Sequence, residues 1–172
     1  MSVEEHKKES PSSVSCKVIT VSDTRTEETD KSGILIKDQL VQNGHSVSQY
    51  AIVKDEVDEI RSAVLEGCQS EDVEVILING GTGIAKRDVT IETLEPLFTK
   101  EIPGYGELFR MLSYTEDIGS AAIMSRAVAG VIDSTAVFAM PGSSGAVALA
   151  MTKLILPEIG HVRREINKDL PK

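Results

Sequence analysis

The sequence is poor in aromatic residues, cysteines and histidines. Trp is absent and aromatic residues make up 3% of the 172 residues, so we expect a core of Val, Ile, Leu and Ala. The two cysteines, Cys16 and Cys68, stand far apart with no Cys or His at metal-ligand spacing, which indicates reduced thiols in a cytoplasmic protein. The three histidines are scattered too, without the spacing of a zinc site or the pattern of a catalytic triad.

Basic charge and long apolar runs are also in short supply. The formal net charge of −9 argues against nucleic acid as a partner, because phosphate backbones need a basic face. Apolar stretches are shorter than a membrane span and the N-terminus lacks the apolar core of a signal peptide, so we expect no membrane partner and a cytoplasmic location. Residues 1–14 are polar and predict a disordered N-terminal tail, followed by a single α/β domain at residues 15–168.

Strand and helix patterns alternate along this domain. Short β-branched runs predict strands at residues 16–21, 47–53, 73–78 and 135–140, with a short edge strand at 128–132. Amphipathic stretches predict helices at residues 32–43, 56–67, 105–114, 120–127 and 143–168, the last broken near Pro157, and another helix beginning near Thr90. Continuously apolar strands are typical of a parallel sheet buried on both faces. The sequence therefore predicts an α/β fold, a three-layer α/β/α sandwich with a mostly parallel sheet.

Three loops of small and hydroxyl-bearing residues follow predicted strands, at residues 22–24, 79–83 and 141–145. Glycines let the backbone approach a ligand and turn successive N–H groups toward one point, and the last loop runs into a helix whose first amides favour an anion. One such loop is more often structural than functional, but three at one sheet edge indicate a site for a phosphate-bearing small molecule. Residues 80–83 lack both the P-loop ending and the dinucleotide fingerprint, which argues against a conventional NTPase or dehydrogenase.

Two acidic residues near these loops have alternative interpretations. In one interpretation Asp88 or Thr90 caps the next helix and Lys86 and Arg87 are solvated. In the other, Asp88 holds Mg²⁺ and the two basic residues offset ligand charge. Asp55 follows the second predicted strand, and by position alone a helix cap before Glu56 is favoured.

Several motifs occur together in the order and spacing of one known family. They are VSDT at residues 21–24, DKSG at 30–33, GGTGIAKRDVT at 80–90, IPGYGELFR at 102–110, SR at 125–126 and MPGSSGA at 140–146. Through them the chain resembles the MoaB/MogA family of molybdenum cofactor biosynthesis, in particular its MoaB branch. The resemblance implies the molybdopterin-binding fold, assembled as a homotrimer or a hexamer. It also implies transfer of AMP from Mg-ATP to the terminal phosphate of molybdopterin, giving adenylyl-molybdopterin for a MoeA-type molybdenum insertion protein, and pyrophosphate.

The resemblance also assigns roles to residues of this chain. Asp55 and Asp88 match acidic positions that bind Mg²⁺ and position the reaction, which for Asp55 replaces the helix-cap interpretation. A second set lines the ligand site: Ser22, Asp23, Thr24, Gly80, Gly81, Thr82, Gly83, Gly142 and Ser143, with Ser113 and Ser125 on the pterin side. Retention of three aspartates favours an active enzyme. The alternatives are a non-catalytic molybdopterin-binding or carrier protein of the same pathway and a CinA-type nucleotide pyrophosphatase.

Overall fold

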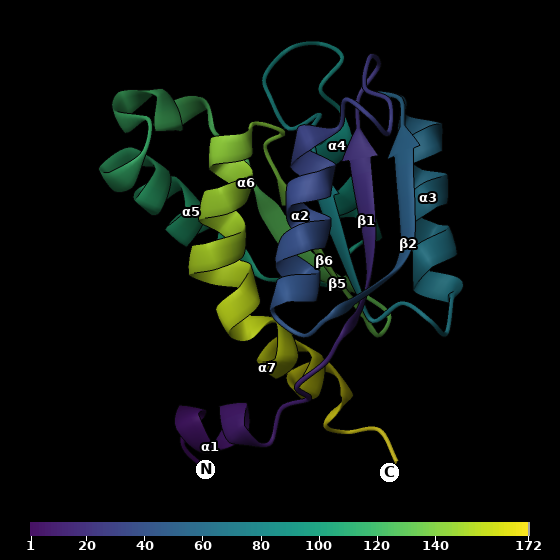
Figure 1. Ribbon diagram of the computed structural model, residues 1–172, viewed down its shortest axis with the longest axis vertical. Helices are drawn as coiled ribbons and strands as arrows, with labels where there is room; N and C mark the ends of the chain where they lie inside the picture. Colours follow the sequence, from purple (N-terminus) through teal and green to yellow (C-terminus); the bar gives the residue numbers. More distant parts are fainter. Residues whose placement is uncertain (172) are drawn as a thin grey trace.

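Six strands form one mixed sheet in the computed structural model, which describes residues 1–171 (Figure 1). The strands lie in the order β2-β1-β3-β6-β5-β4, and β1, β2, β3 and β6 are parallel, whereas β5 is antiparallel to both of its neighbours. Their bounds are β1 (Ser15–Val21), β2 (Ser46–Val53), β3 (Val75–Asn79), β4 (Lys100–Glu101), β5 (Val128–Ile132) and β6 (Thr135–Met140). The predicted mostly parallel sheet is confirmed, with the two-residue strand β4 as an addition.

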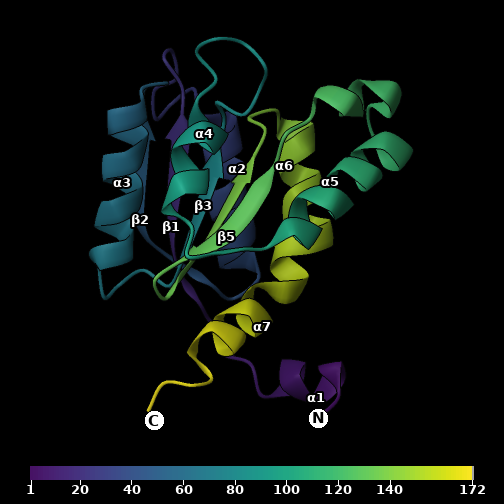
Figure 2. The ribbon, with the colours of Figure 1, turned by 180° about the vertical axis from the view of Figure 1, so that it is seen from behind.

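Helices cover both faces of this sheet. They are α1 (Val3–Lys8), α2 (Lys31–Gln42), α3 (Val57–Gln69), α4 (Thr90–Leu94), α5 (Pro103–Glu116), α6 (Ser144–Ala150) and α7 (Leu156–Asn167), with 3-10 helices at Glu95–Leu97 and Gly119–Met124. Helices α2, α5 and α6 pack on one face, and α3 and α4 on the other (Figures 1 and 2). The predicted three-layer sandwich is therefore present.

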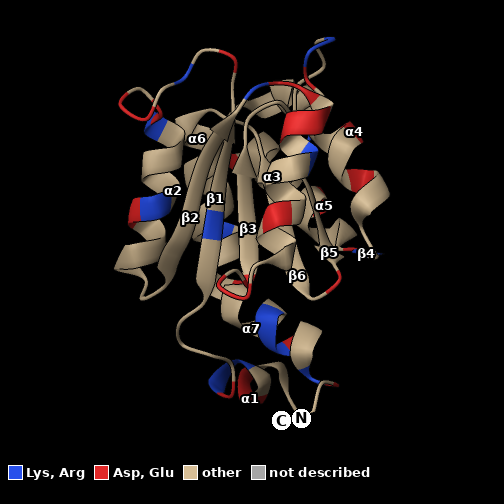
Figure 3. Ribbon diagram, turned by 90° about the vertical axis from the view of Figure 1, so that its right-hand side faces the viewer, with Lys and Arg blue, Asp and Glu red and all other residues tan. Residues whose placement is uncertain are grey.

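The strands are apolar throughout because both of their faces are covered. In β3, Val75 and Leu77 belong to the core under α2 and α6, whereas Ile76 and Ile78 belong to the core under α3 and α4. All four side chains are fully buried. In Figure 3 most charged segments lie on helices and loops; the exceptions are one basic segment on β1, the strand that contains Lys17, and the two-residue strand β4, whose residues are both charged. The Nζ of Lys17 donates a 2.7 Å hydrogen bond to the Ala63 carbonyl, which compensates for its burial.

The C-terminal helical region differs from the prediction. Instead of breaking near Pro157, it runs from Ser144 to Asn167, with the π-helical segment Met151–Ile155 immediately before the proline. This wider turn accommodates a ring that donates no backbone hydrogen bond. The continuous helix is long and apolar enough, by length and composition, to cross a membrane, which the sequence patterns did not lead us to expect. Its side chains Val147, Met151 and Ile155 are fully buried in the core, and the other apolar side chains that pack there are partly buried, so core packing accounts for the apolar composition.

The N-terminal residues also differ from the predicted disordered tail. Helix α1 begins with a capping box between Ser2 and Glu5, and it lies against α7 near the C-terminus (Figure 1). An ion pair between Arg164 on α7 and Glu9 (2.7 Å) joins the two segments. The polar composition that suggested disorder supplies these contacts instead, because charged side chains from the two chain ends meet in space.

Candidate functional site

The carboxyl ends of the four parallel strands meet at one edge of the sheet, at the top of Figure 1. Their loops are in direct contact. The Ser22 N–H donates a 2.8 Å hydrogen bond to the last carbonyl of β2, and the Gly80 N–H donates a 3.1 Å bond to the last carbonyl of β6. A Cβ built on Gly142 would lie 3.2 Å from the Gly80 Cα. The structure therefore brings together the three loops that the sequence singled out.

The glycine turn, residues 80–83, has a backbone that only glycine adopts without strain. Gly80 and Gly81 have φ angles of +94° and +67°. A Cβ on Gly80 would lie 2.2 Å from the carbonyl oxygen of Val21, and one on Gly81 would lie 2.3 Å from Oγ1 of Thr90 and 3.1 Å from Oδ1 of Asp55. The turn is therefore packed tightly against β1 and against the Asp55 carboxylate.

All four carbonyl groups of the glycine turn accept hydrogen bonds, two from Thr90 and two from Arg126. Thr90 donates its hydroxyl to the Gly80 carbonyl (2.9 Å) and its N–H to the Gly81 carbonyl (3.0 Å). Arg126 donates to the carbonyls of Thr82 (2.9 Å) and Gly83 (2.7 Å). Within residues 1–171, by contrast, no hydrogen-bond acceptor is found for the N–H groups of residues 81, 82 and 83. A turn with its carbonyls engaged and three of its N–H groups free is suited to an anion.

Arg126 is the residue of this site that sequence reasoning did not identify as functional. Its guanidinium also pairs with Glu92 (2.6 Å), so it links the start of β5, helix α4 and the glycine turn. The sequence did contain a signal for Arg126, because this residue belongs to one of the motifs that the chain shares with the family it resembles. Its partners, however, are backbone carbonyls on a distant loop, and no spacing rule reveals such a pairing.

Arg87 binds carboxylates of the protein itself. Its guanidinium makes a two-pronged contact with Asp23 (2.7 and 3.0 Å) and a further contact with Glu56 (3.0 Å). The sequence allowed two interpretations of Arg87, a solvated side chain or one that offsets ligand charge. The structure shows a third arrangement, in which Arg87 pairs with carboxylates of the protein. The hydrogen bonds from Arg87 keep the pKa of the Asp23 carboxyl below its usual value.

Asp55 lies between two other carboxylates and is not used as a helix cap. The residue that caps α3 is Glu56, which makes no capping hydrogen bond through its side chain, so the cap interpretation for Asp55 is wrong. The Asp55 N–H donates a 3.2 Å bond to Asp23, which ties the loops after β1 and β2 together. Burial, and then the negative charges of Asp23 and Asp88, raise the pKa of the Asp55 carboxyl.

Asp88 also does not cap the helix that follows it. Helix α4 is preceded by Val89 and has no side-chain cap, so capping by Asp88 or Thr90 is excluded. The Asp88 carboxylate instead accepts a 3.0 Å hydrogen bond from the Ala85 N–H, which folds the loop back on itself.

The carboxylates at this edge fit a divalent cation such as Mg²⁺. A hollow of about 370 Å³ opens beside Asp55 and is lined also by Glu56, Lys86 and Arg87. A cation here would offset the negative charges of Asp23 and Asp88, which add to the effect of burial in raising the pKa of Asp55. Asp23, Asp55 and Asp88 do not converge on one point as a closed set of ligands. Such an open set suits Mg²⁺, which usually takes one or two carboxylates and completes its shell with water and substrate phosphate.

The remaining predicted residues surround this centre less closely. The Ser22 hydroxyl accepts hydrogen bonds from the N–H groups of Thr24 (3.2 Å) and Arg25 (3.1 Å), so it shapes its own loop. The Ser143 hydroxyl caps α6. Ser113 is buried in α5, Ser125 ends the 3-10 helix just before Arg126, and within residues 1–171 neither is hydrogen bonded to the glycine turn.

Comparisons with known proteins give the family and the fold that this chain shares. The family described as "Probable molybdopterin binding domain" matches residues 17–161. A molybdenum cofactor biosynthesis protein B from Bacillus subtilis (strain 168) is 68% identical over 169 residues, which cover 98% of this chain and 99% of the relative. A crystal structure of a molybdenum cofactor biosynthesis protein B is 60% identical with a TM-score of 0.91, covering 94% of this chain and 100% of that one. The tungsten cofactor synthesizing protein MoaB from Pyrococcus furiosus is 39% identical with a TM-score of 0.81, covering 91% and 98%.

Proposed function

The chain belongs to the molybdopterin-binding family of MoaB- and MogA-type molybdenum cofactor biosynthesis proteins, and on this basis we propose that it is a molybdopterin adenylyltransferase. In the proposed reaction an oxygen of the terminal phosphate of molybdopterin attacks the α-phosphorus of ATP. A new P–O–P bond forms, the bond between the α-phosphorus and the oxygen of the β-phosphate breaks, and pyrophosphate leaves. The products are adenylyl-molybdopterin and pyrophosphate, and no residue of the protein is modified.

The observation that carries this proposal is the glycine turn, with its carbonyls engaged and its N–H groups free beside Asp55. The free N–H groups and the first turn of α6 would hold phosphate oxygens in place. Asp55 and Asp88 would hold Mg²⁺, which supplies positive charge for the crowded phosphates when bound. A transfer between two anions needs mainly such positioning and charge compensation, and it needs no covalent intermediate on the protein.

The assay is incubation of the protein with molybdopterin and Mg-ATP, with quantification of pyrophosphate and adenylyl-molybdopterin. Equal amounts of both products support the transferase. Tight molybdopterin binding without pyrophosphate would leave the alternative, a non-catalytic binding or carrier protein of the same pathway. Pyrophosphate released in the absence of molybdopterin would identify a nucleotide pyrophosphatase instead.

Asp55→Asn tests the assigned role with little change in volume. We expect turnover to fall by about 10²–10³-fold, the usual loss when one preorganised electrostatic contact is removed, while molybdopterin binding is retained. Asp58→Asn is the matched control, because Asp58 is an exposed acid one turn further along the same segment. Equal turnover in the two variants would exclude Asp55 from catalysis.

The remaining features of the proposal concern the assembly and its setting. We propose a homotrimer, with a hexamer as the alternative, that acts in the cytoplasm and passes its product to a MoeA-type insertion protein. The exposed apolar side chains of α5 and the adjoining 3-10 helix support self-association: Leu108, Met111, Tyr114, Ile118, Ile123 and Met124. This arm extends away from the sheet, to the left in Figure 1 and to the right in Figure 2. Sedimentation equilibrium distinguishes the monomer, trimer and hexamer.

A further inference from the structure

Helix α1 lies on α7 although little in its own sequence holds it there. It has six residues, none of them buried, and an isolated helix of that length is unstable in water. Exposed ion pairs such as Lys7 with Glu158 and Arg164 with Glu9 contribute about 0–1 kcal/mol each. These ion pairs are therefore too weak to hold α1 on α7 by themselves, and a stronger interaction between the two helices is needed.

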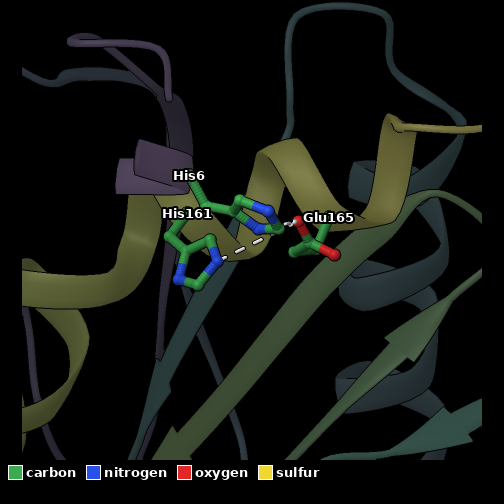
Figure 4. Close-up of side chains that lie close together, drawn as sticks. All are labelled: His6, His161 and Glu165. Carbon is green, nitrogen blue, oxygen red and sulfur yellow. Dashed lines mark ion pairs between the residues drawn. The ribbon is translucent and has the colours of Figure 1, made fainter. Parts of the chain in front are cut away.

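Three metal-binding side chains meet at this contact. Nδ1 of His6 on α1 lies 3.2 Å from Oε1 of Glu165 on α7, and Nε2 of His161 lies 4.0 Å from the same oxygen. The three ligand atoms all lie within 4.8 Å of one another, and the side chains are 20–32% exposed. Figure 4 shows both rings directed at the carboxylate. Within residues 1–171 this is the one group of at least three His, Cys, Asp or Glu side chains with ligand atoms this close.

The spacing of these atoms suits zinc. Two imidazole nitrogens and a carboxylate oxygen are ordinary ligands of Zn²⁺, and bonds of 2.0–2.2 Å in a tetrahedral arrangement place ligand atoms about 3.3 Å apart. The distance between Nδ1 of His6 and Oε1 of Glu165 is already close to this value, and small side-chain rotations would shorten the other two distances. His161 and Glu165 are four residues apart, so one face of α7 presents both.

An outer contact orients one of the histidines for metal binding. The Nδ1 of His161 lies 3.0 Å from Oε2 of Glu158, whose other oxygen pairs with Lys7. A histidine that binds zinc through one nitrogen usually donates the other N–H to a carboxylate, which fixes the ring and strengthens the ligand. A cavity of about 520 Å³ opens beside His161 and Glu165 and gives an ion and a water ligand access.

The charges around the group are compatible with a bound cation. Glu165 also accepts hydrogen bonds from Arg164 (2.8 Å) and Lys168 (3.0 Å). Zinc on Oε1 would replace the Arg164 contact, and Arg164 would keep its pair with Glu9 (2.7 Å). Lys168 binds the other carboxylate oxygen, which leaves Oε1 for the metal.

We propose that His6, His161 and Glu165 form a zinc site that fixes α1 to α7, independent of the function proposed for the opposite edge of the sheet. No sequence pattern indicated this site, because His6 and His161 lie far apart in the chain and neither belongs to a zinc motif.

The test uses the full-length chain, stripped of metal with a chelator and kept in excess Mg²⁺ so that the carboxylates near Asp55 do not take up zinc. Titration with Zn²⁺ against a chromophoric chelator should show one tight site per chain. His6→Gln and His161→Gln should lose it, whereas His45→Gln, which also removes one histidine, should retain it. Glu158→Gln should weaken binding by about 10–100-fold without lowering the melting temperature of the metal-free protein.

A second measurement tests what the zinc does. Amide hydrogen exchange at residues 3–8 should slow on addition of Zn²⁺ in the unmodified protein and stay unchanged in His161→Gln. Absence of a tight site, or equal binding by His6→Gln and His45→Gln, would overturn the proposed ligands. Zinc binding that leaves exchange at residues 3–8 unchanged would overturn the structural role. Neither result depends on adenylyl transfer, so this proposal and the proposed enzyme fail separately.

Discussion

Gly81→Ala tests whether the glycine turn needs glycine because of its backbone angle or because of its close packing. Alanine at a φ of +67° carries a strain of about 1–2 kcal/mol. Its Cβ would lie 2.3 Å from the Thr90 hydroxyl, so that hydroxyl must rotate away and release the Gly80 carbonyl, at a net loss of about 0.5–1.5 kcal/mol. The sum is a destabilisation of about 1.5–3.5 kcal/mol. Because domains of this kind are stable by about 5–15 kcal/mol, we expect the variant to fold.

Alanine substitutions at two other glycines separate the contribution of backbone strain from that of close packing. Gly119 has a φ of +61° but no atom within 4 Å of its Cβ position, so Gly119→Ala should show the strain alone, about 1–2 kcal/mol. Gly104 lies in the first turn of α5 with open space around it, and Gly104→Ala should be neutral or stabilise by about 0.5–1 kcal/mol. Urea denaturation gives the three free energies of unfolding, and calorimetry should show a melting temperature lower by about 3–14 °C for Gly81→Ala.

The comparison can refute the structural argument. If Gly81→Ala destabilises no more than Gly119→Ala, the packing of the turn against Thr90 and Asp55 is not what requires glycine. If its melting temperature falls as expected but molybdopterin binding is unchanged, the turn is structural and the ligand binds elsewhere.

Three further predictions concern single side chains. Asp88→Asn should lower adenylyl transfer by about 10²–10³-fold with molybdopterin binding intact, because it removes charge but little volume; unchanged turnover would exclude a role in metal binding. Arg126→Gln should destabilise the protein by about 1–3 kcal/mol and weaken ligand binding, because it releases two carbonyls of the turn. The control is Arg110→Gln, since Arg110 is exposed, and it should change neither stability nor binding in denaturation and binding assays. Burial lowers the pKa of His45, and its Nδ1 accepts a hydrogen bond from the Val14 N–H (3.1 Å). The contribution of neutral His45 to stability is therefore complete above about pH 6.5 and is lost as the pH falls through the lower native pKa. Unfolding free energies at pH 8 and pH 5.5, measured with chelator present, should therefore differ less in His45→Gln than in the unmodified protein.

The parts of the fold that the sequence predicted are those fixed by local pattern. The four parallel strands are apolar because both faces of the sheet are buried, so their positions stand out in the sequence. The gathering of the three loops follows from parallel strands ending at one edge. Strand β4 has two exposed residues and exists only by pairing with β5, which no local pattern encodes. The pairings of Arg126 with backbone carbonyls and of Arg87 with Asp23 are long-range as well, and they explain why the roles of these two arginines were not predicted.

An acidic chain can hold an anion only if its donors are local, and this requirement applies to the phosphate binding that we propose. The net charge is −9, and one arginine near the glycine turn, Arg87, is already bound to Asp23 and Glu56. The other, Arg126, also pairs with an acid, yet two of its hydrogen bonds go to backbone carbonyls of the glycine turn. In the proposed function the free N–H groups would therefore be the fixed donors for a phosphate, and the carboxylate of Asp55 beside them would repel it. A cation between the two removes that repulsion, so phosphate binding should be strong only when a divalent ion accompanies it. Measured without Mg²⁺, the affinity for ATP should rise on Asp55→Asn; a fall would show that Asp55 does not face the bound phosphate.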